Sequence, residues 1–143
     1  MSGIPESFNA FRIHNDAKGY RSGVETISPE QLGDGEVAIR TSWSGINYKD
    51  ALAATGKGKI LKTYPLNGGI DVAGTVIESQ SDDFQPDDLV LANGSGLSEV
   101  RDGGYSEYLR LPADIVVPLP AGLSMREAMG LGTAGFTAAM SLF

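Results

Sequence analysis

Residues 36–51, from Glu36 to Ala51, decide the fold of this chain, and they read EVAIRTSWSGINYKDA. In this stretch Val37, Ile39, Thr41 and Trp43 alternate with Glu36, Ala38, Arg40 and Ser42. Such alternation predicts a half-buried strand, because successive side chains of a strand point to opposite faces. We expect Trp43 to lie on the apolar face, and Gly45 ends the pattern.

A short helix is expected directly after this strand. Asn47 is a suitable N-cap, and Asp50 falls in the first turn, where a negative charge favours the helix dipole. The helix should run from about Tyr48 to Ala54 and end at Thr55-Gly56. For Asn47 and Asp50 capping is the favoured role. The phenol of Tyr48, beside a strand end broken by glycine, could orient a ligand or donate a proton.

Strand patterns recur on both sides of this segment, separated by glycine-containing turns. The expected strands are 7–15, 23–27, 70–77, 89–92, 105–111 and 115–117. Many short strands with little helix indicate a mainly β domain, either an antiparallel barrel or a sandwich. Asp71 lies within the apolar strand 70–77, so it must be either exposed at an edge or hydrogen-bonded.

The pattern changes at Ser124. Ser124 and Glu127 have the spacing of a capping box, and a helical pattern continues from there to Phe143. This predicts a domain over residues 1–123 and, over residues 124–143, the first helix of a second domain that the chain does not contain. The sequence of residues 130–135, GLGTAG, fits G-x-G-x-x-G but follows a helix rather than a strand, which argues against a phosphate-binding loop. We expect these glycines to break the helix for tight packing or for close approach of a ligand.

Composition excludes several kinds of function. The 143 residues carry a net charge of −7, which disfavours nucleic acid or an anionic membrane as partner. There is no cysteine and a single histidine, His14, so a histidine–cysteine zinc site cannot be assembled. No secretory signal or membrane span is evident, which indicates a cytoplasmic protein. The loop after the short helix carries three lysines, Lys57, Lys59 and Lys62. They are either solvated or bind a phosphate group of a ligand.

Four segments together resemble the medium-chain dehydrogenase/reductase superfamily, in particular its zinc-independent quinone oxidoreductase and acrylyl-CoA reductase group. They are SGINYKDALAATGKGK (44–59), GIDVAGTV (69–76), GGYSEYL (103–109) and GTAGFTA (132–138). The resemblance implies a GroES-like distorted antiparallel barrel with short helices, followed by a missing Rossmann domain. Zinc alcohol dehydrogenases carry Gly-His-Glu where this chain has Gly69-Ile70-Asp71, so the resemblance implies no catalytic zinc.

The resemblance also implies a reaction. NADPH would transfer hydride to an activated alkene, namely an enoyl thioester such as acrylyl-CoA or an enone, or to a quinone. Asn47, Tyr48 and Thr133 would contact the nicotinamide end of NADPH, and Tyr48 is the candidate catalytic proton donor. With most of the NADPH site missing, the chain alone should be inactive.

A second hypothesis remains open, namely a stand-alone GroES-like binding or assembly module without catalysis. In either case the apolar C-terminal helix, if uncovered, could mediate a homodimer.

Overall fold

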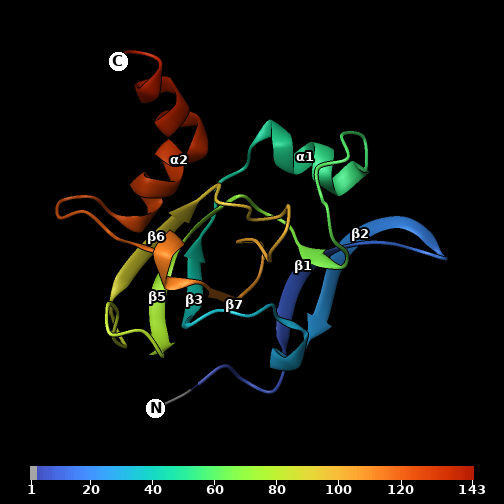
Figure 1. The fold of residues 1–143 in the computed structure, drawn as a ribbon, viewed down its shortest axis with the longest axis horizontal. Coiled ribbons are helices and arrows are strands. Elements are labelled where there is room, and N and C mark those ends of the chain that lie inside the picture. Colours follow the sequence, from blue (N-terminus) through green and yellow to red (C-terminus); the bar gives the residue numbers. More distant parts are fainter. Residues whose placement is uncertain (1–2) are drawn as a thin grey trace.

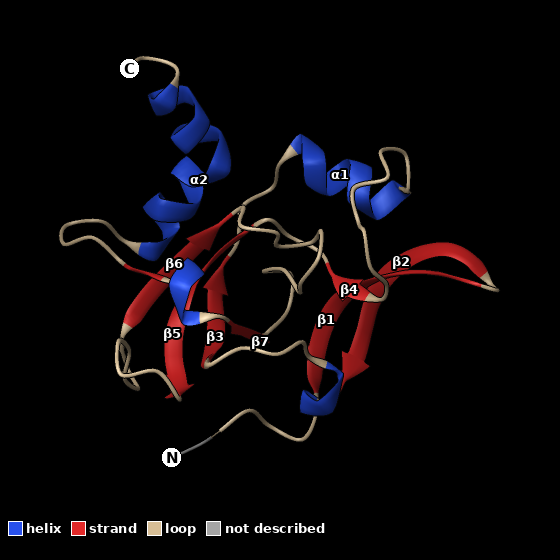
Figure 2. Cartoon of the chain, viewed as in Figure 1, coloured by secondary structure: helices blue, strands red, loops and turns tan. Residues whose placement is uncertain are grey.

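Two antiparallel sheets form the body of the molecule (Figures 1 and 2), as described for residues 3–143 by a computed structural model. The five-stranded sheet has the order β7-β3-β5-β6-β8, and the three-stranded sheet has the order β2-β1-β4. The strands are β1 (Phe8–Asp16), β2 (Gly19–Ile27), β3 (Val37–Trp43), β4 (Leu66–Asn67), β5 (Asp71–Ser79), β6 (Leu89–Asn93), β7 (Tyr108–Leu111) and β8 (Val117–Pro118). The helices are α1 (Tyr48–Thr55) and α2 (Met125–Met140), and the 3-10 turns are Pro29–Gln31 and Ala113–Ile115. The mainly β antiparallel prediction is confirmed.

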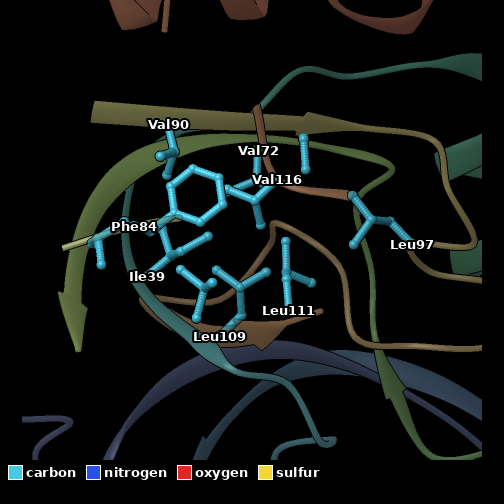
Figure 3. Packing of buried hydrophobic residues seen from close by; sticks show 11 residues of the cluster. Ile39, Val72, Phe84, Val90, Leu97, Leu109, Leu111 and Val116 are labelled. Carbon is cyan, nitrogen blue, oxygen red and sulfur yellow. The ribbon is translucent and has the colours of Figure 1, made fainter. Parts of the chain in front are cut away.

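The largest apolar core is enclosed by the five-stranded sheet (Figure 3). Alternate residues of β3 and β7 and the inner face of β5 and β6 supply most of it, and loop residues close it. Each of its larger apolar side chains contributes about 1.5–3 kcal/mol by leaving water. The buried members are Val37, Ile39, Val72, Val76, Phe84, Val90, Ala92, Leu97, Leu109, Leu111 and Val116.

The expected placement of Trp43 on the apolar face of β3 is wrong, because its side chain is 48% exposed. The strand has a register shift between Thr41 and Trp43, so that Thr41 faces Gly74 and Trp43 faces Ala73 on β5. An inserted residue of this kind re-aims the side chains that follow it. Trp43 instead lies under the guanidinium of Arg126 on α2, at 5.9 Å from the ring centroid.

Other strand boundaries also differ from expectation, and β2 begins at Gly19 rather than at Gly23. β7 begins at Tyr108 rather than Tyr105, because Tyr105 leaves the sheet: its N–H bonds to Gly68 and its carbonyl accepts from Phe11. The expected strand 115–117 is a 3-10 turn followed by the short β8. Segment 103–105 thus connects the two sheets.

Helix α2 begins as the sequence predicts. The N–H of Glu127 donates to Ser124 Oγ at 3.2 Å, and Ser124 N donates to Glu127 Oε2 at 2.9 Å. The first half of α2 buries Ala128 and Met129 against Ala73 of β5. After a kink the second half extends away from the sheets (Figure 1). Within residues 3–143, no helix has both the length and the apolar character needed to cross a bilayer.

Segment 103–105 yields a stability prediction, because a Cβ on Gly103 would lie 2.1 Å from the carbonyl oxygen of Gly69. Gly103→Ala should lower the free energy of unfolding by about 3 kcal/mol or prevent folding, since backbone cannot move aside. Gly23→Ala on β2 is the control, because its Cβ meets nothing within 4 Å. Urea unfolding followed by circular dichroism measures both, and equal stability of the two variants would contradict this account.

Candidate functional site

The carboxylate of Asp71, at the start of β5, is buried with 1% of the residue exposed. It accepts hydrogen bonds from Asn47 Nδ2 at 2.8 Å and from Asn93 Nδ2 at 2.7 Å. Thr133 donates to it twice, from its backbone N–H at 3.1 Å and from its hydroxyl at 2.5 Å. These four residues are called the Asp71 cluster below. Of the two alternatives that the sequence left open for Asp71, the hydrogen-bonded one is correct.

Asn47 reaches the cluster because Asp50 fixes its position. Asn47 is the N-cap of α1, as expected, and Asp50 Oδ2 accepts from its backbone N–H at 2.8 Å and from its Nδ2 at 3.1 Å. Asp50 Oδ1 accepts from the N–H of Ile70 at 3.0 Å, so this buried carboxylate also ties α1 to the residue before Asp71. The sequence indicated only the helix-start role of Asp50.

Thr133 reaches the cluster because α2 is kinked at Gly132, where φ is 50° and ψ is −158°. This conformation is essentially restricted to glycine. A Cβ at Gly132 would lie 2.7 Å from Asp71 Oδ2. The expected glycine break in this helix is therefore confirmed, and its reason is tight packing against a carboxylate.

Tyr105 holds the turn between β3 and α1 in place. Its hydroxyl donates to the carbonyl oxygen of Gly45 at 2.9 Å, while Ser44 Oγ donates to the carbonyl oxygen of Asp71 at 2.6 Å. Burial raises the pKa of the Tyr105 phenol well above its usual value, and the carboxylates of Asp50 and Asp71 act in the same direction. Tyr105 therefore remains a neutral donor over the whole ordinary pH range. Nothing in its local sequence distinguished it from the other residues of its motif.

Tyr48 lies next to this cluster in sequence but faces solvent. It is the first residue of α1 and is 81% exposed. A hollow of about 320 Å³ lies beside the same turn, and it is lined by Phe11, Ile46, Asp50, Ala51, Ala54 and Tyr105. The structure thus brings Asn47 and Thr133 together through Asp71 and leaves the phenol of Tyr48 free to meet a ligand.

A larger groove of about 680 Å³ runs along α2, and Thr133 is part of its wall. Its other lining residues come from β6, the turn that follows β6, the 3-10 turn before β8, β8 itself and α2. They are Leu91, Asn93, Gly94, Ser95, Asp114, Ile115, Val117, Phe136 and Thr137. The groove therefore combines an apolar wall with hydroxyl, amide and carboxylate groups.

The lysines after α1 lie outside the residues that line this groove. Lys62 and Lys49 bind the same carboxylate, Glu99, at 2.5 and 3.0 Å, and these contacts lower the pKa of Glu99. Lys57 and Lys59 are exposed. His14 pairs with Glu25 at 2.6 Å on the β1–β2 hairpin, as a strand-face residue. Among residues 3–143, no three histidine, cysteine or acidic side chains are grouped as metal ligands.

Comparison with known proteins gives consistent matches. Residues 33–121 match the family described as the alcohol dehydrogenase GroES-like domain. The Bacillus subtilis protein YhfP is 48% identical over 135 residues, which are 94% of this chain and 41% of YhfP. The acrylyl-CoA reductase AcuI of Ruegeria pomeroyi is 39% identical over 137 residues, which are 94% of this chain and 42% of that protein.

Solved structures agree with these matches. The yhdH oxidoreductase from Salmonella enterica in complex with NADP has a TM-score of 0.89 at 43% identity, over 94% of this chain and 41% of that one. The Bacillus subtilis protein yhfP with NAD bound has a TM-score of 0.88 at 47% identity, over 96% of this chain and 42% of that one. The chain thus spans less than half the length of these relatives.

Two glycines of α2 that are two residues apart should respond to alanine in opposite ways. Gly132→Ala should lower the free energy of unfolding by at least about 2 kcal/mol, because it combines a disallowed backbone conformation with a clash at Asp71. Gly130→Ala should raise it by up to about 1 kcal/mol, since its Cβ meets nothing within 4 Å and alanine favours the helix. Thermal or urea unfolding measures both, and a tolerated Gly132→Ala would argue against the kink.

Proposed function

Because the chain belongs to the alcohol dehydrogenase GroES-like domain family, we propose that it is the substrate-side part of an NADPH-dependent oxidoreductase. The proposed reaction reduces an activated alkene, either an enoyl thioester such as acrylyl-CoA or an enone, or a quinone. Relatives that are an acrylyl-CoA reductase and, in mouse, a quinone oxidoreductase support this substrate range. Neighbouring structures with NADP or NAD bound support the cofactor class. We place the protein in the cytoplasm.

The single observation that carries this proposal is the Asp71 cluster. Its members come from the turn after β3, the start of β5, the end of β6 and the kink of α2, four places far apart in the sequence. A fold gathers such polar groups at one place, with an exposed phenol beside them, where a ligand is to be oriented. Three of the segments are ones whose motifs resemble the reductase group.

The residues present fit the nicotinamide end of the cofactor better than its phosphate end. An aromatic ring can lie on the apolar wall of the groove at Leu91 and Ile115, in the groove that Thr133 also lines. No lysine, arginine or histidine is among the groove's lining residues. The phosphates are therefore assigned to a nucleotide-binding domain that begins with residues 124–143 and continues outside this chain. The chain alone is then expected to be inactive.

When bound, NADPH supplies a hydride to the β-carbon of the alkene. A proton must then reach the α-carbon, so that one hydride and one proton saturate the double bond. We assign the proton donor to the phenol of Tyr48, which can regain its proton from water because it is exposed. Tyr48, Asn47 and Thr133 are the proposed contacts to the nicotinamide end.

The proposed reaction uses no zinc. The oxygens of Asp71, at the position of the glutamate in the Gly-His-Glu motif, are already occupied by amide, hydroxyl and backbone donors. Ile70 offers no ligand atom at the histidine position, and the sequence contains no cysteine. Positioning and hydrogen bonding must then polarise the substrate.

The enzymatic proposal is tested with the protein expressed together with any coding sequence that follows Phe143. NADPH absorbance should fall with acryloyl-CoA, an enone or a quinone as acceptor, and treatment with a zinc chelator should leave the rate unchanged. Absence of turnover with every acceptor would overturn the proposal. Loss of activity on chelation would overturn its zinc-free part.

Removing only the hydroxyl group of Tyr48 should separate proton donation from cofactor binding. In the active protein, Tyr48→Phe should lower kcat by about 10²-fold or more, because a positioned acid contributes at least that much, while KM for NADPH changes little. Tyr108→Phe is the control, since Tyr108 packs edge-on against Phe8, with ring centroids 5.4 Å apart, away from the turn that carries Tyr48. An unchanged kcat for Tyr48→Phe would remove Tyr48 from the mechanism.

The projecting half of α2 should make the isolated chain self-associate. The exposed apolar side chains on it and next to it are Phe136 and Met140, Leu131 just before the kink, and Leu142 and Phe143 after the helix ends. We assign their cover to the remainder of the protein. Light scattering should show dimers or larger species that become monomeric with Phe136→Lys plus Met140→Lys. The control Val24→Lys alters an exposed apolar residue on β2 and should not change the state. A monomer at all concentrations without these substitutions would argue against an uncovered surface.

A further inference from the structure

The loop that follows α1 is a basic segment of an acidic chain. Residues 51–70 contain no acidic side chain, although the chain as a whole has a net charge of −7. They carry three lysines, which are Lys57, Lys59 and Lys62. Residues 56–62 are called the lysine loop below. A local excess of cations attracts anions even to a protein of negative net charge. The function proposed above uses none of these lysines.

Glu99, from the loop between β6 and β7, draws two lysine side chains together. Its Oε1 lies 2.5 Å from Lys62 Nζ, and its Oε2 lies 3.0 Å from Lys49 Nζ at the start of α1. The backbone N–H of Lys62 also donates to the carbonyl oxygen of Glu99 at 2.7 Å, which fixes the lysine loop to this residue. The group of three side chains thus carries one more positive than negative charge.

The two lysines of this group are more accessible than the carboxylate that holds them. The side chain of Glu99 is 24% exposed, whereas those of Lys49 and Lys62 are 43% and 66% exposed. A ligand that approaches this surface therefore meets the ammonium groups first. Lys57 and Lys59 are exposed on the same loop and enlarge the positive surface. An ammonium group of this kind is a common binder of phosphate.

Lys59 has a backbone conformation that is uncommon for its residue type. Its φ is 48°, in the left-handed region that glycine and asparagine adopt more readily. Its side chain is exposed, so packing does not explain why a lysine stands there. Residues kept in such conformations are concentrated at ligand-binding and catalytic positions. The conformation of Lys59 is therefore a second observation that points to a ligand at the lysine loop.

The positive surface leads away from the groove along α2. It begins at Lys49, which follows Tyr48 in sequence, and continues to the loop beyond the end of α1. The eight residues of α1 span about 12 Å. Figure 1 shows that α1 starts on the side of α2 and that the lysine loop leaves its far end. A ligand that reacts beside Tyr48 and reaches these lysines must therefore be long and carry its anionic groups at one end.

We propose that Lys49 and the lysine loop bind the phosphate groups of a CoA thioester, so that the protein selects this substrate over an uncharged enone or quinone. The inference rests on the function proposed above, which includes all three acceptors. In a CoA thioester the pantetheine arm separates the reacting acyl group from a diphosphate and a 3′-phosphate, whereas enones and quinones need no anionic tail. The phosphates of NADPH are assigned to the nucleotide-binding domain and leave these lysines to the second substrate.

Binding is tested on this 143-residue chain without turnover. Backbone amide resonances of the lysine loop and of Glu99 are followed by NMR during titration with CoA, 3′-dephospho-CoA and pantetheine. CoA should shift these resonances, and added salt should weaken the effect. 3′-Dephospho-CoA should bind about 5-fold more weakly, the loss expected when one exposed ionic contact is removed. Pantetheine should cause no shift at these residues.

Lysine variants distinguish a defined site from general attraction to positive charge. Lys62→Gln and Lys49→Gln should each weaken CoA binding about 3- to 5-fold. Lys18→Gln is the matched control, because it removes the same charge from an exposed position in the turn between β1 and β2 and should leave the affinity unchanged. Lys59→Gly should weaken binding without lowering the free energy of unfolding, since glycine adopts a positive φ readily. An equal loss in Lys18→Gln would overturn the inference.

Kinetics of the longer protein separate the two substrates. Lys59→Gly combined with Lys62→Gln should lower the ratio of kcat/KM for acryloyl-CoA to that for an enone about 10-fold. A rise in KM for NADPH in its place would assign the lysines to the cofactor and overturn the inference. No shift with CoA, or equal binding of CoA and pantetheine, would overturn it as well. If CoA binds the chain through these lysines but the longer protein reduces no acceptor, the reductase proposal fails and the CoA site remains.

Discussion

A buried carboxylate needs partners, and the rest of the site depends on how Asp71 obtains them. No cation lies among its hydrogen-bond partners, which are two side-chain amides, one hydroxyl and one backbone N–H. Each of these comes from a different part of the chain or from the kink of α2, so satisfying one charge fixes the relative positions of both helices and two strands. Leaving such a group partly unsatisfied in the interior would cost several kcal/mol. The cluster is therefore as much a condition of folding as a feature of the site.

Local features of this fold could be predicted from the sequence because they depend on neighbouring residues. The β1–β2 hairpin, the N-cap at Asn47 and the capping box at Ser124 all follow from spacing and residue type. Trp43 was misplaced because a register shift depends on the partner strand, which period alone does not reveal. The same holds for Tyr105, whose role is set by carbonyl groups of distant segments.

The candidate site was only partly accessible to sequence reasoning. The sequence singles out Tyr48 as a phenol beside a strand end, and the resemblance adds Asn47 and Thr133 as cofactor contacts. The structure brings Asn47 and Thr133 onto one carboxylate. Asp71 itself left two alternatives open, because a charged residue in an apolar strand says nothing about which partners satisfy it. Those partners lie 22 to 62 residues away in sequence. Only the folded chain shows that they meet.

The kink at Gly132 has a mechanical consequence. It divides α2 into a first half that is buried against β5 and a second half that extends away, with the kink beside Asp71. The second half of α2 cannot rotate about this kink without breaking the hydrogen bonds from Thr133 to Asp71. One of those bonds shares its acceptor, Asp71 Oδ2, with Asn47 at the start of α1. A displacement of the second half of α2 is thus transmitted through the carboxylate of Asp71 to Asn47 and the turn that carries Tyr48. The same carboxylate limits how far the second half of α2 can move.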